Sequence, residues 1–377
     1  MDNFNLTNEQ SAAVSAATSS AFHIITGPAG SGKTTLISEM IKTLRRRREE
    51  IKLCAFTGKA AEIVGSKTGE PSSTIHSMLE YDGYGFKCES LRGYCVIVDE
   101  ASMVDSHLMA QIIKRKPDRL ILVGDCAQLP PVGKGQPFHD LIKIKPSIVS
   151  RIKDVHRAKG QILEIATMMR NGEKVIVNDN IASDEKVYLC EESDHRCAHN
   201  EIIKAVNNGF FDFTQDVILC PKNDDANSLN YQIARIVNPR DCNRRIIEGD
   251  RIINTKNIPK KDFWNGSVGI VISINSKGMK ILPDNGTDEV SLSKEESQNI
   301  QLSYALTVHK SQGSEYRRVF FLCLERDKYM LDRSLVYTAI TRAKKVCAII
   351  GNVELFKSTS LNHKKKETVL QQLAKND

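Results

Sequence analysis

The stretch Gly27-Pro28-Ala29-Gly30-Ser31-Gly32-Lys33-Thr34 decides the fold class of this chain. It follows the β-rich run Phe22 to Thr26 and matches the pattern Gly-x-x-x-x-Gly-Lys-Thr, whose glycines let backbone N–H groups curl around phosphate oxygens at the start of a helix. The order of strand, loop and helix predicts a nucleoside-triphosphate site. We expect Lys33 to hold the β- and γ-phosphates and Thr34 to reach Mg²⁺ through its hydroxyl, and we include Thr35 in the nucleotide-binding segment.

Further β-rich runs alternate with amphipathic helical stretches on both sides of this loop, which is the pattern of a parallel sheet with crossover helices. In the first half they are Lys52 to Phe56, Tyr94 to Val98 and Leu120 to Val123. In the second half they are Asp216 to Cys220, Arg318 to Cys323 and Val346 to Ile350. The sequence therefore predicts two α/β domains, 1–149 and 150–377.

Each domain is predicted to carry a small insertion. In residues 79–94, two tyrosines and a phenylalanine surround the turn pair Asp82-Gly83, which favours a short β-hairpin, although a packed aromatic loop is an equal alternative. In residues 256–295, β-branched residues and the turn pairs Asn265-Gly266 and Asn285-Gly286 predict a small antiparallel, SH3-like β insertion.

Composition narrows the class of protein. The chain has 377 residues, 41% hydrophobic and 26% charged, with a net charge of +7 that is compatible with a polyanionic partner. Its ten cysteines are scattered through apolar runs, as is typical of reduced thiols, and Cys190, His195, Cys197 and His199 lack the paired spacing of a zinc site. No apolar run approaches the roughly 20 residues that span a bilayer. We expect a cytoplasmic protein with no membrane partner.

Two more strand ends supply groups for hydrolysis. Asp99 and Glu100 follow the run Val96-Ile97-Val98, where Asp99 is expected to bind Mg²⁺ and Glu100 to polarise the attacking water as general base. Gln128, in the polar loop after Leu122-Val123-Gly124, is the expected sensor of the γ-phosphate, with an ordinary turn glutamine as the alternative. The chain is thus predicted to hydrolyse ATP.

The order of these segments resembles superfamily 1 helicases, specifically their RecD/Dda-like branch, over nearly the whole chain. Leu6 to Gln10 resembles the adenine-reading segment, in which Gln10 would read the base edge. Val155-His156-Arg157 resembles the segment that offers an arginine to the γ-phosphate, and Tyr337 to Ala343 resembles the final motif, which contributes Arg342. Thr307 to Glu315 resembles the motif shared between nucleic acid and nucleotide, with Gly313 and Glu315 on the nucleotide side.

The resemblance implies two RecA-like motor domains with ATP and Mg²⁺ between them and single-stranded DNA bound across both. Hydroxyls and cations suit backbone phosphates, and aromatic faces suit bases. The expected DNA contacts are Phe56, Thr57, Lys59, Thr74 and His76 in the first domain, and Thr307, His309, Lys310 and Ser311 in the second.

The predicted function is ATP-dependent translocation on single-stranded DNA with unwinding of duplex and forked DNA. Travel from 5′ to 3′ is implied by the family resemblance alone. A translocase or protein-displacing ATPase with weak unwinding, and a nucleotide-gated binding or loading subunit, are the alternatives. An RNA substrate stays open, because contacts with the backbone do not discriminate against a 2′-OH. We expect a monomeric motor in a bacterial or phage-infected cytoplasm, with replication or recombination proteins as partners.

Overall fold

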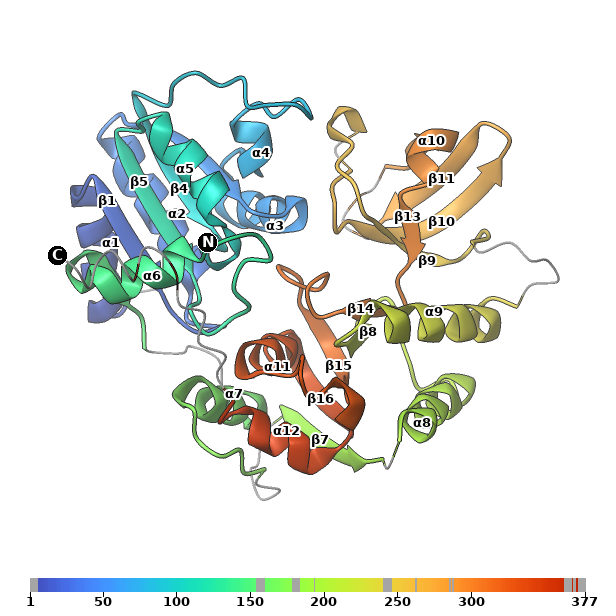
Figure 1. Cartoon of the computed structure of the whole chain (residues 1–377). Helices are drawn as coiled ribbons and strands as arrows, with labels where there is room; N and C mark the ends of the chain where they lie inside the picture. The colour runs from blue at the N-terminus through green and yellow to red at the C-terminus, as the bar shows by residue number, and fades with distance from the viewer. Residues whose placement is uncertain are drawn as a thin grey trace. The chain divides into compact units, whose positions relative to one another are not determined.

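The computed structural model describes residues 6–153, 160–177, 184–192, 194–239, 246–261, 263–284, 286, 288–362, 368 and 371. Its contacts divide the chain into two compact units, Met1–Ala158 with Lys365–Asp377, and Lys159–Lys364. Figure 1 shows an α/β architecture in each unit, as the sequence predicted. No helix in the described ranges is long and apolar enough to cross a membrane.

A six-stranded parallel sheet forms the centre of the first unit, with strand order β3-β2-β4-β5-β1-β6. Its strands are β1 (Phe22–Thr26), β2 (Glu50–Ala55), β3 (Ser72–Thr74), β4 (Tyr94–Asp99), β5 (Arg119–Gly124) and β6 (Val149–Arg151). Its helices are α1 (Asn8–Ser19), α2 (Lys33–Arg46), α3 (Gly58–Thr68), α4 (Ile75–Met78), α5 (Ser106–Lys114) and α6 (Pro137–Ile144).

Helices cover both faces of this sheet, because successive strand side chains point to opposite faces. On β5, Ile121 and Val123 join the core under α1, α2 and α3, whereas Leu120 and Leu122 join the core under α4, α5 and α6. Burial on both faces explains why these strands are continuous apolar runs in the sequence.

The first unit extends beyond the predicted boundary at 149/150. Strand β6 pairs with β1, with Ile24 opposite Val149, so residues 150 and 151 belong to the first sheet. Thr368 and Gln371 hydrogen bond to Asp140 on α6, so the chain also returns to the first unit near its C-terminal end. The prediction of one uninterrupted second domain over 150–377 missed this return.

The second unit is built on a five-stranded parallel sheet with strand order β14-β8-β15-β16-β7. Its strands are β7 (Lys186–Glu191), β8 (Asp216–Cys220), β14 (Ala305–Thr307), β15 (Tyr316–Cys323) and β16 (Ala343–Gly351). Its longer helices are α7 (Gln161–Asn171), α8 (His195–Asn207), α9 (Asn223–Val237), α11 (Arg333–Ile340) and α12 (Val353–Thr359). The sequence predicted β8, β15 and β16, but not the two edge strands β7 and β14.

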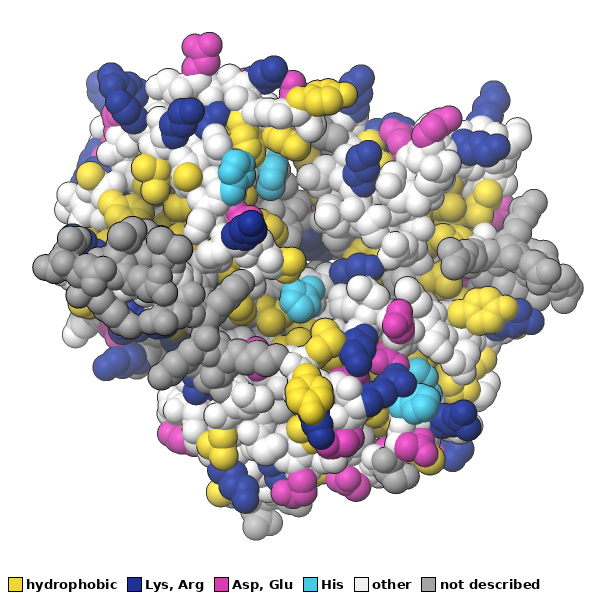
Figure 2. Space-filling view, viewed as in Figure 1, with side chains coloured by type: hydrophobic (Ala, Val, Ile, Leu, Met, Phe, Trp, Pro, Cys, Tyr) yellow, Lys and Arg dark blue, Asp and Glu magenta, His cyan; other side chains and the backbone are white. Residues whose placement is uncertain are grey.

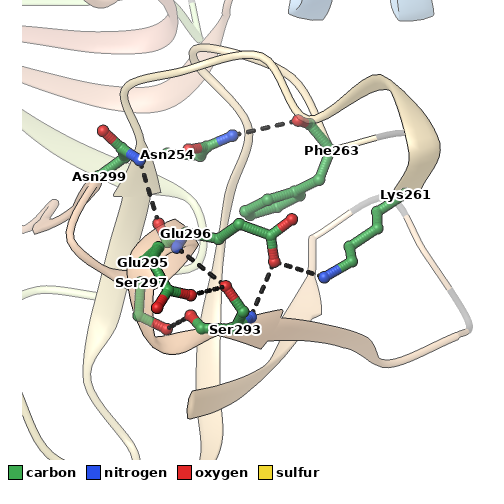
Figure 3. A network of polar contacts seen from close by, with 8 residues as sticks. All are labelled: Asn254, Lys261, Phe263, Ser293, Glu295, Glu296, Ser297 and Asn299. Atoms are coloured by element: carbon green, nitrogen blue, oxygen red, sulfur yellow. Dashed lines mark hydrogen bonds and ion pairs between the residues drawn. The ribbon is translucent and has the colours of Figure 1, made fainter. Parts of the chain in front are cut away.

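The predicted β insertion of the second unit is a five-stranded antiparallel sheet, in the order β12-β11-β10-β9-β13. Its strands are β9 (Arg251–Asn254), β10 (Val268–Asn275), β11 (Gly278–Pro283), β12 (Val290–Ser293) and β13 (Ile300–Leu302). It exceeds the predicted range of 256–295 because β9 and β13, the first and last strands of the insertion along the chain, pair with each other. Figure 3 shows Lys261 next to Glu296, whose carboxylate also accepts from the backbone of Ser293. The Lys261 ammonium lies 2.5 Å from the Glu296 carboxylate. These polar contacts tie the loop after β9 to the short helix α10 (Lys294–Ser297).

The predicted hairpin of the first unit is very small. Its only ladder pair in the described range 79–94 is the antiparallel bridge between Tyr81 and Phe86. The carboxylate of Asp82 accepts hydrogen bonds from the backbone of Tyr84 and Gly85, which closes the turn. The Tyr84 side chain at its tip is 99% exposed.

Candidate nucleotide and nucleic-acid site

The phosphate loop joins β1 to α2 with the backbone that its glycines permit. Gly30 and Gly32 have φ angles of 79° and 80°, in the left-handed region that favours glycine. A Cβ on Gly27 would lie 2.6 Å from the hydroxyl of Ser31, so the loop is also closely packed. The Lys33 ammonium donates to the carbonyls of Gly27 at 3.0 Å and Pro28 at 2.9 Å, and it therefore lies over the cradle of its own loop.

Gln10 is attached to this loop. Its amide nitrogen donates to the Ser31 carbonyl at 3.1 Å, and its amide oxygen accepts from the backbone of Thr7 in the capping box of α1. The side chain is 2% exposed. Gln10 thus holds the phosphate loop against α1, and its predicted contact with adenine stays a prediction.

Three loops meet at the carboxyl ends of β4, β5 and β1, which are neighbours in the sheet. The backbone of Gly27 donates to the carbonyl of Gly124 at 3.2 Å, and the backbone of Cys126 donates to the Thr26 hydroxyl at 3.3 Å. A Cβ on Gly124 would lie 3.0 Å from the backbone nitrogen of Ser102. The structure therefore brings the loops that carry Lys33, Glu100 and Gln128 to one edge, where such sheets bind ligands. Thr26, which the sequence analysis did not single out, joins two of them.

The two acidic residues at the end of β4 are closely coupled. Glu100 donates from its backbone to the carboxylate of Asp99 at 2.9 Å. Burial and the neighbouring Glu100 carboxylate raise the pKa of Asp99 to about 7. Glu100 adopts a φ of 49°, an uncommon conformation for a residue with a side chain, and its Oε2 is buried without a hydrogen-bond partner. Backbone strain and an unpaired buried oxygen cluster at functional sites.

Gln128, on the adjoining loop, also has a buried side-chain oxygen without a hydrogen-bond partner. Its side chain is 2% exposed, and this oxygen is Oε1. Its backbone N–H bonds to the carbonyl of Asp125 at 3.2 Å, which fixes the turn that presents it.

Arg342, Gly313 and Glu315 come together in the second unit. The Arg342 guanidinium donates to the carbonyls of Thr338 at 3.3 Å and Ser314 at 3.1 Å. Gly313 has a φ of 77°, and Glu315 pairs with Lys344 at 3.4 Å. Because Ser314 lies between Gly313 and Glu315, the Arg342 contact joins the two predicted motifs. The predicted Arg157 lies outside the described residues.

The predicted DNA contacts of the first unit gather at the carboxyl ends of β2 and β3, where Ala55 pairs with Thr74. The hydroxyls of Thr57 and Thr74 cap α3 and α4, and the Lys59 ammonium lies 3.7 Å from Glu62. Phe56 packs against the core.

His76 also contacts the hairpin. Its ring stacks on Phe86 at 5.9 Å between ring centroids and meets the edge of Tyr81 at 5.6 Å. The pKa of His76 is lowered by this burial. His76 therefore anchors the hairpin, and a contact with DNA would add to that structural role.

In the second unit, the predicted contacts form the loop after β14. Thr307 accepts from the backbone of Lys310 at 3.4 Å, and the Ser311 hydroxyl donates to the carbonyl of Val308 at 2.8 Å. The Lys310 ammonium donates to Gln301 at 2.8 Å, and burial lowers the pKa values of His309 and Lys310. On the face shown in Figure 2, Lys and Arg side chains are interspersed with Asp and Glu rather than gathered into one patch.

A further polar group follows β8 and β15, where the sequence analysis named no site. The Lys222 ammonium pairs with Asp327 at 2.5 Å, and Asp225 pairs with both His199 and Arg326. The signal was present in Pro221-Lys222-Asn223, a polar turn directly after an apolar strand, the same pattern as at Asp99 and Gln128. No group of three potential metal ligands occurs in the part of the chain that the structure describes.

Comparisons with known proteins agree with this geometry. A family model described as an AAA domain matches residues 5–189, and one described as a UvrD-like helicase C-terminal domain matches residues 302–350. The chain is 33% identical over 354 residues to the ATP-dependent RecD2 DNA helicase of Deinococcus radiodurans, covering 90% of this chain and 48% of that relative. It is 25% identical over 408 residues to the RecD subunit of the RecBCD enzyme of Mycobacterium tuberculosis, covering 92% of this chain and 69% of that subunit. The chain thus spans about half the length of the RecD2 relative.

Solved structures share the fold. A structure of Pif1 helicases at forked duplex DNA aligns with a TM-score of 0.60 at 18% identity, covering 92% of each chain. The Pif1 helicase of Candida albicans aligns with a TM-score of 0.55 at 19% identity, covering 99% of each chain. The two family models in this order, together with the RecD-type relatives, confirm the predicted resemblance, and the chain belongs to the superfamily 1 helicases, in their RecD-like branch.

Proposed function

We propose that this chain is an ATP-driven motor that travels 5′ to 3′ on single-stranded DNA and unwinds duplex DNA. One observation carries the ATP-hydrolysing part of the proposal, and the direction of travel rests on the resemblance to RecD-like helicases. In and next to the phosphate loop, Oε2 of Glu100 and Oε1 of Gln128 are buried without a hydrogen-bond partner among the described residues, as are the hydroxyls of Ser31 and Ser102. An unpaired buried oxygen costs free energy unless a bound group satisfies it. A water molecule aligned for attack on the γ-phosphate satisfies such an acceptor in the ATP complex.

The residues at this edge divide the chemistry among them. Lys33 exchanges the carbonyls of Gly27 and Pro28 for the β- and γ-phosphates when ATP enters. Glu100 accepts a proton from the attacking water, and Gln128 orients that water or the γ-phosphate.

A divalent cation fits beside them. The half-buried carboxylate of Asp99, whose pKa is raised toward 7 next to Glu100, is the donor that a cation would keep ionised, and Thr34 adds a hydroxyl oxygen. Mg²⁺ held by Thr34 and Asp99 would neutralise charge on the phosphates.

Arginines complete the reaction in this proposal. Arg342 is already oriented by two carbonyls, and it contributes positive charge to the γ-phosphate together with Arg157. An arginine of this kind is worth about 10³ to 10⁵ in rate. Gly313 and Glu315 lie on either side of Ser314, which contacts Arg342, and they respond to the bound nucleotide. They closely follow Thr307 to Ser311, the residues that contact the DNA, so one segment serves both ligands.

The test uses the full chain with Mg²⁺ and ATP on duplexes that carry either a 5′ or a 3′ single-stranded tail. We expect ATP hydrolysis that single-stranded DNA stimulates, and strand separation on the 5′-tailed substrate alone. Unwinding from the 3′ tail would contradict the polarity, and ATPase activity that DNA does not stimulate would contradict the motor itself. A tailed RNA substrate in parallel reports the preference between the two nucleic acids.

A second candidate function is translocation or protein displacement with weak unwinding. The hairpin favours it, because a single bridge between Tyr81 and Phe86 offers little structure for splitting a duplex. Strong DNA-stimulated ATPase and displacement of a bound protein, without strand separation, would identify it. A nucleotide-gated loading subunit would show neither activity as an isolated monomer, and would need replication or recombination proteins for turnover.

A further inference from the structure

Asp140 on α6 is a buried carboxylate with unusual partners. Its side chain is fully buried, and its oxygens accept from the Thr368 hydroxyl at 2.7 Å and from the Gln371 amide at 2.5 Å. No Lys or Arg among the described residues forms an ion pair with it. A buried carboxylate needs hydrogen bonds to offset the loss of water. Among the described residues, its side chain is satisfied by two neutral donors from one segment.

That segment is distant in the sequence. Thr368 and Gln371 follow α12 of the second unit, yet they belong to the first unit through Asp140. Gln371 also donates from its backbone to the Thr368 hydroxyl at 3.4 Å, so the two donors support each other. We refer to Thr368 and Gln371 as the return segment.

Helix α6 lies directly behind the loop that carries Gln128. The ring of Phe138 is so close to Gly124 that a Cβ there would lie 3.1 Å from Cζ of the ring. Burial and the nearby Lys143 lower the pKa of His139 to about 4, against the opposing influence of Asp140, Asp125 and the backbone of Cys126. Phe138 and His139 of α6 thus pack against residues 124 to 126.

We propose that Asp140 is a positioning residue for ATP hydrolysis, and that the return segment holds it so that α6 keeps the Gln128 loop in its working geometry. This inference rests on the proposed function for its kinetic consequence. The mechanical statement, that the return segment orders residues 124 to 131, can be tested without any activity. A displacement of about 1 Å at a reacting group costs up to about 100-fold in rate.

The variants change the polarity of this contact and leave the hydrolytic residues intact. In full-length protein, Gln371→Glu places a second carboxylate against Asp140, and Thr368→Val removes the hydroxyl donor. The double variant Asp140→Asn with Gln371→Glu exchanges donor and acceptor, because the new amide can donate to the new carboxylate. Gln232→Glu, on the exposed surface of α9, controls for the added charge.

We measure hydrogen exchange of residues 124 to 131, the melting temperature, and kcat and KM for ATP with saturating single-stranded DNA. Gln371→Glu is expected to speed exchange in this loop and to lower kcat by about tenfold or more, with KM for ATP within about twofold of wild type. The exchanged pair is expected to recover most of both losses, and Gln232→Glu to match wild type.

Unchanged exchange in Gln371→Glu, or an exchanged pair no better than Gln371→Glu, would overturn the inference. A lower melting temperature with normal exchange in residues 124 to 131 would also overturn it, since that describes a merely structural contact. Failure of the proposed function appears differently, as a wild-type chain without DNA-stimulated ATPase activity, and the exchange measurement still decides the inference in that case.

Discussion

Gly124 is the position at which the structure makes the sharpest prediction. It ends β5, pairs with Thr26 of β1, and begins the loop to Gln128. A Cβ there would lie 3.0 Å from the backbone nitrogen of Ser102, 3.1 Å from the Phe138 ring and 3.3 Å from the backbone nitrogen of Ala101. Two of these three neighbours are backbone atoms of the turn after Glu100, which cannot rotate away as a side chain could.

The substitution Gly124→Ala therefore separates the Glu100 turn from the Gln128 loop by a few tenths of an ångström. Overpacking of a core by one carbon costs about 1 to 3 kcal/mol, which lowers the melting temperature of a unit of this size by about 3 to 10 °C. The catalytic effect is larger than the structural one, because both displaced loops carry groups that act on the attacking water. We expect kcat to fall by about 10- to 100-fold, with a smaller change in KM for ATP.

The assay is DNA-stimulated ATP hydrolysis, with ATP affinity measured separately by a fluorescent nucleotide and stability by thermal melting. Gly286→Ala is the matched control, since a Cβ there meets only ordinary contacts of 3.6 Å and no positive φ. Gly124→Ala with kcat within about twofold of wild type would refute the close approach of the two loops as a requirement for hydrolysis.

Four further predictions follow from individual contacts. Glu100→Gln should bind ATP normally but hydrolyse it about 10² to 10⁴ times more slowly, and near-normal turnover would remove Glu100 as the base. Because His139 has a pKa lowered to about 4, the folded state resists its protonation, and the stability present above pH 6.5 should fall as the pH drops from 6.5 to 4. In urea unfolding across this window, wild type should lose about 3 kcal/mol more of its free energy of unfolding than His139→Gln, and parallel losses would contradict this prediction. Lys310→Ala should reduce the dependence of single-strand affinity on salt by about 0.7 in the log–log slope, whereas an unchanged slope would exclude a phosphate contact. Tyr84→Ala should lower unwinding several-fold and leave DNA-stimulated ATPase activity intact, and equal unwinding by both proteins would show that the exposed tip does not act on the duplex.

Local sequence patterns predicted the parts of this protein that depend on neighbouring residues. The phosphate loop was predicted because its glycines, lysine and threonine must follow one another closely to surround a phosphate. Strand β1 was predicted with its observed bounds, Phe22–Thr26, because a strand buried on both faces is a continuous apolar run that ends in a polar turn. The same rule located Asp99 and Gln128 at strand ends. Strand β7 was missed although Val187 to Cys190 is apolar, because a run of only four residues does not by itself distinguish a strand from part of a helix.

Only the tertiary structure decided which distant segments meet at the carboxyl ends of β4, β5 and β1, and which residues hold α6 in place. Nothing in the local pattern of Asp140 shows that its partners lie at positions 368 and 371, because a hydrogen bond between residues more than 200 positions apart depends on the path of the whole chain. The unpaired oxygens of Glu100 and Gln128, likewise, are properties of burial. The sequence by itself determined which chemical groups this chain carries and the family to which it belongs, whereas packing determined which of those groups are kept dry, unpaired and close together.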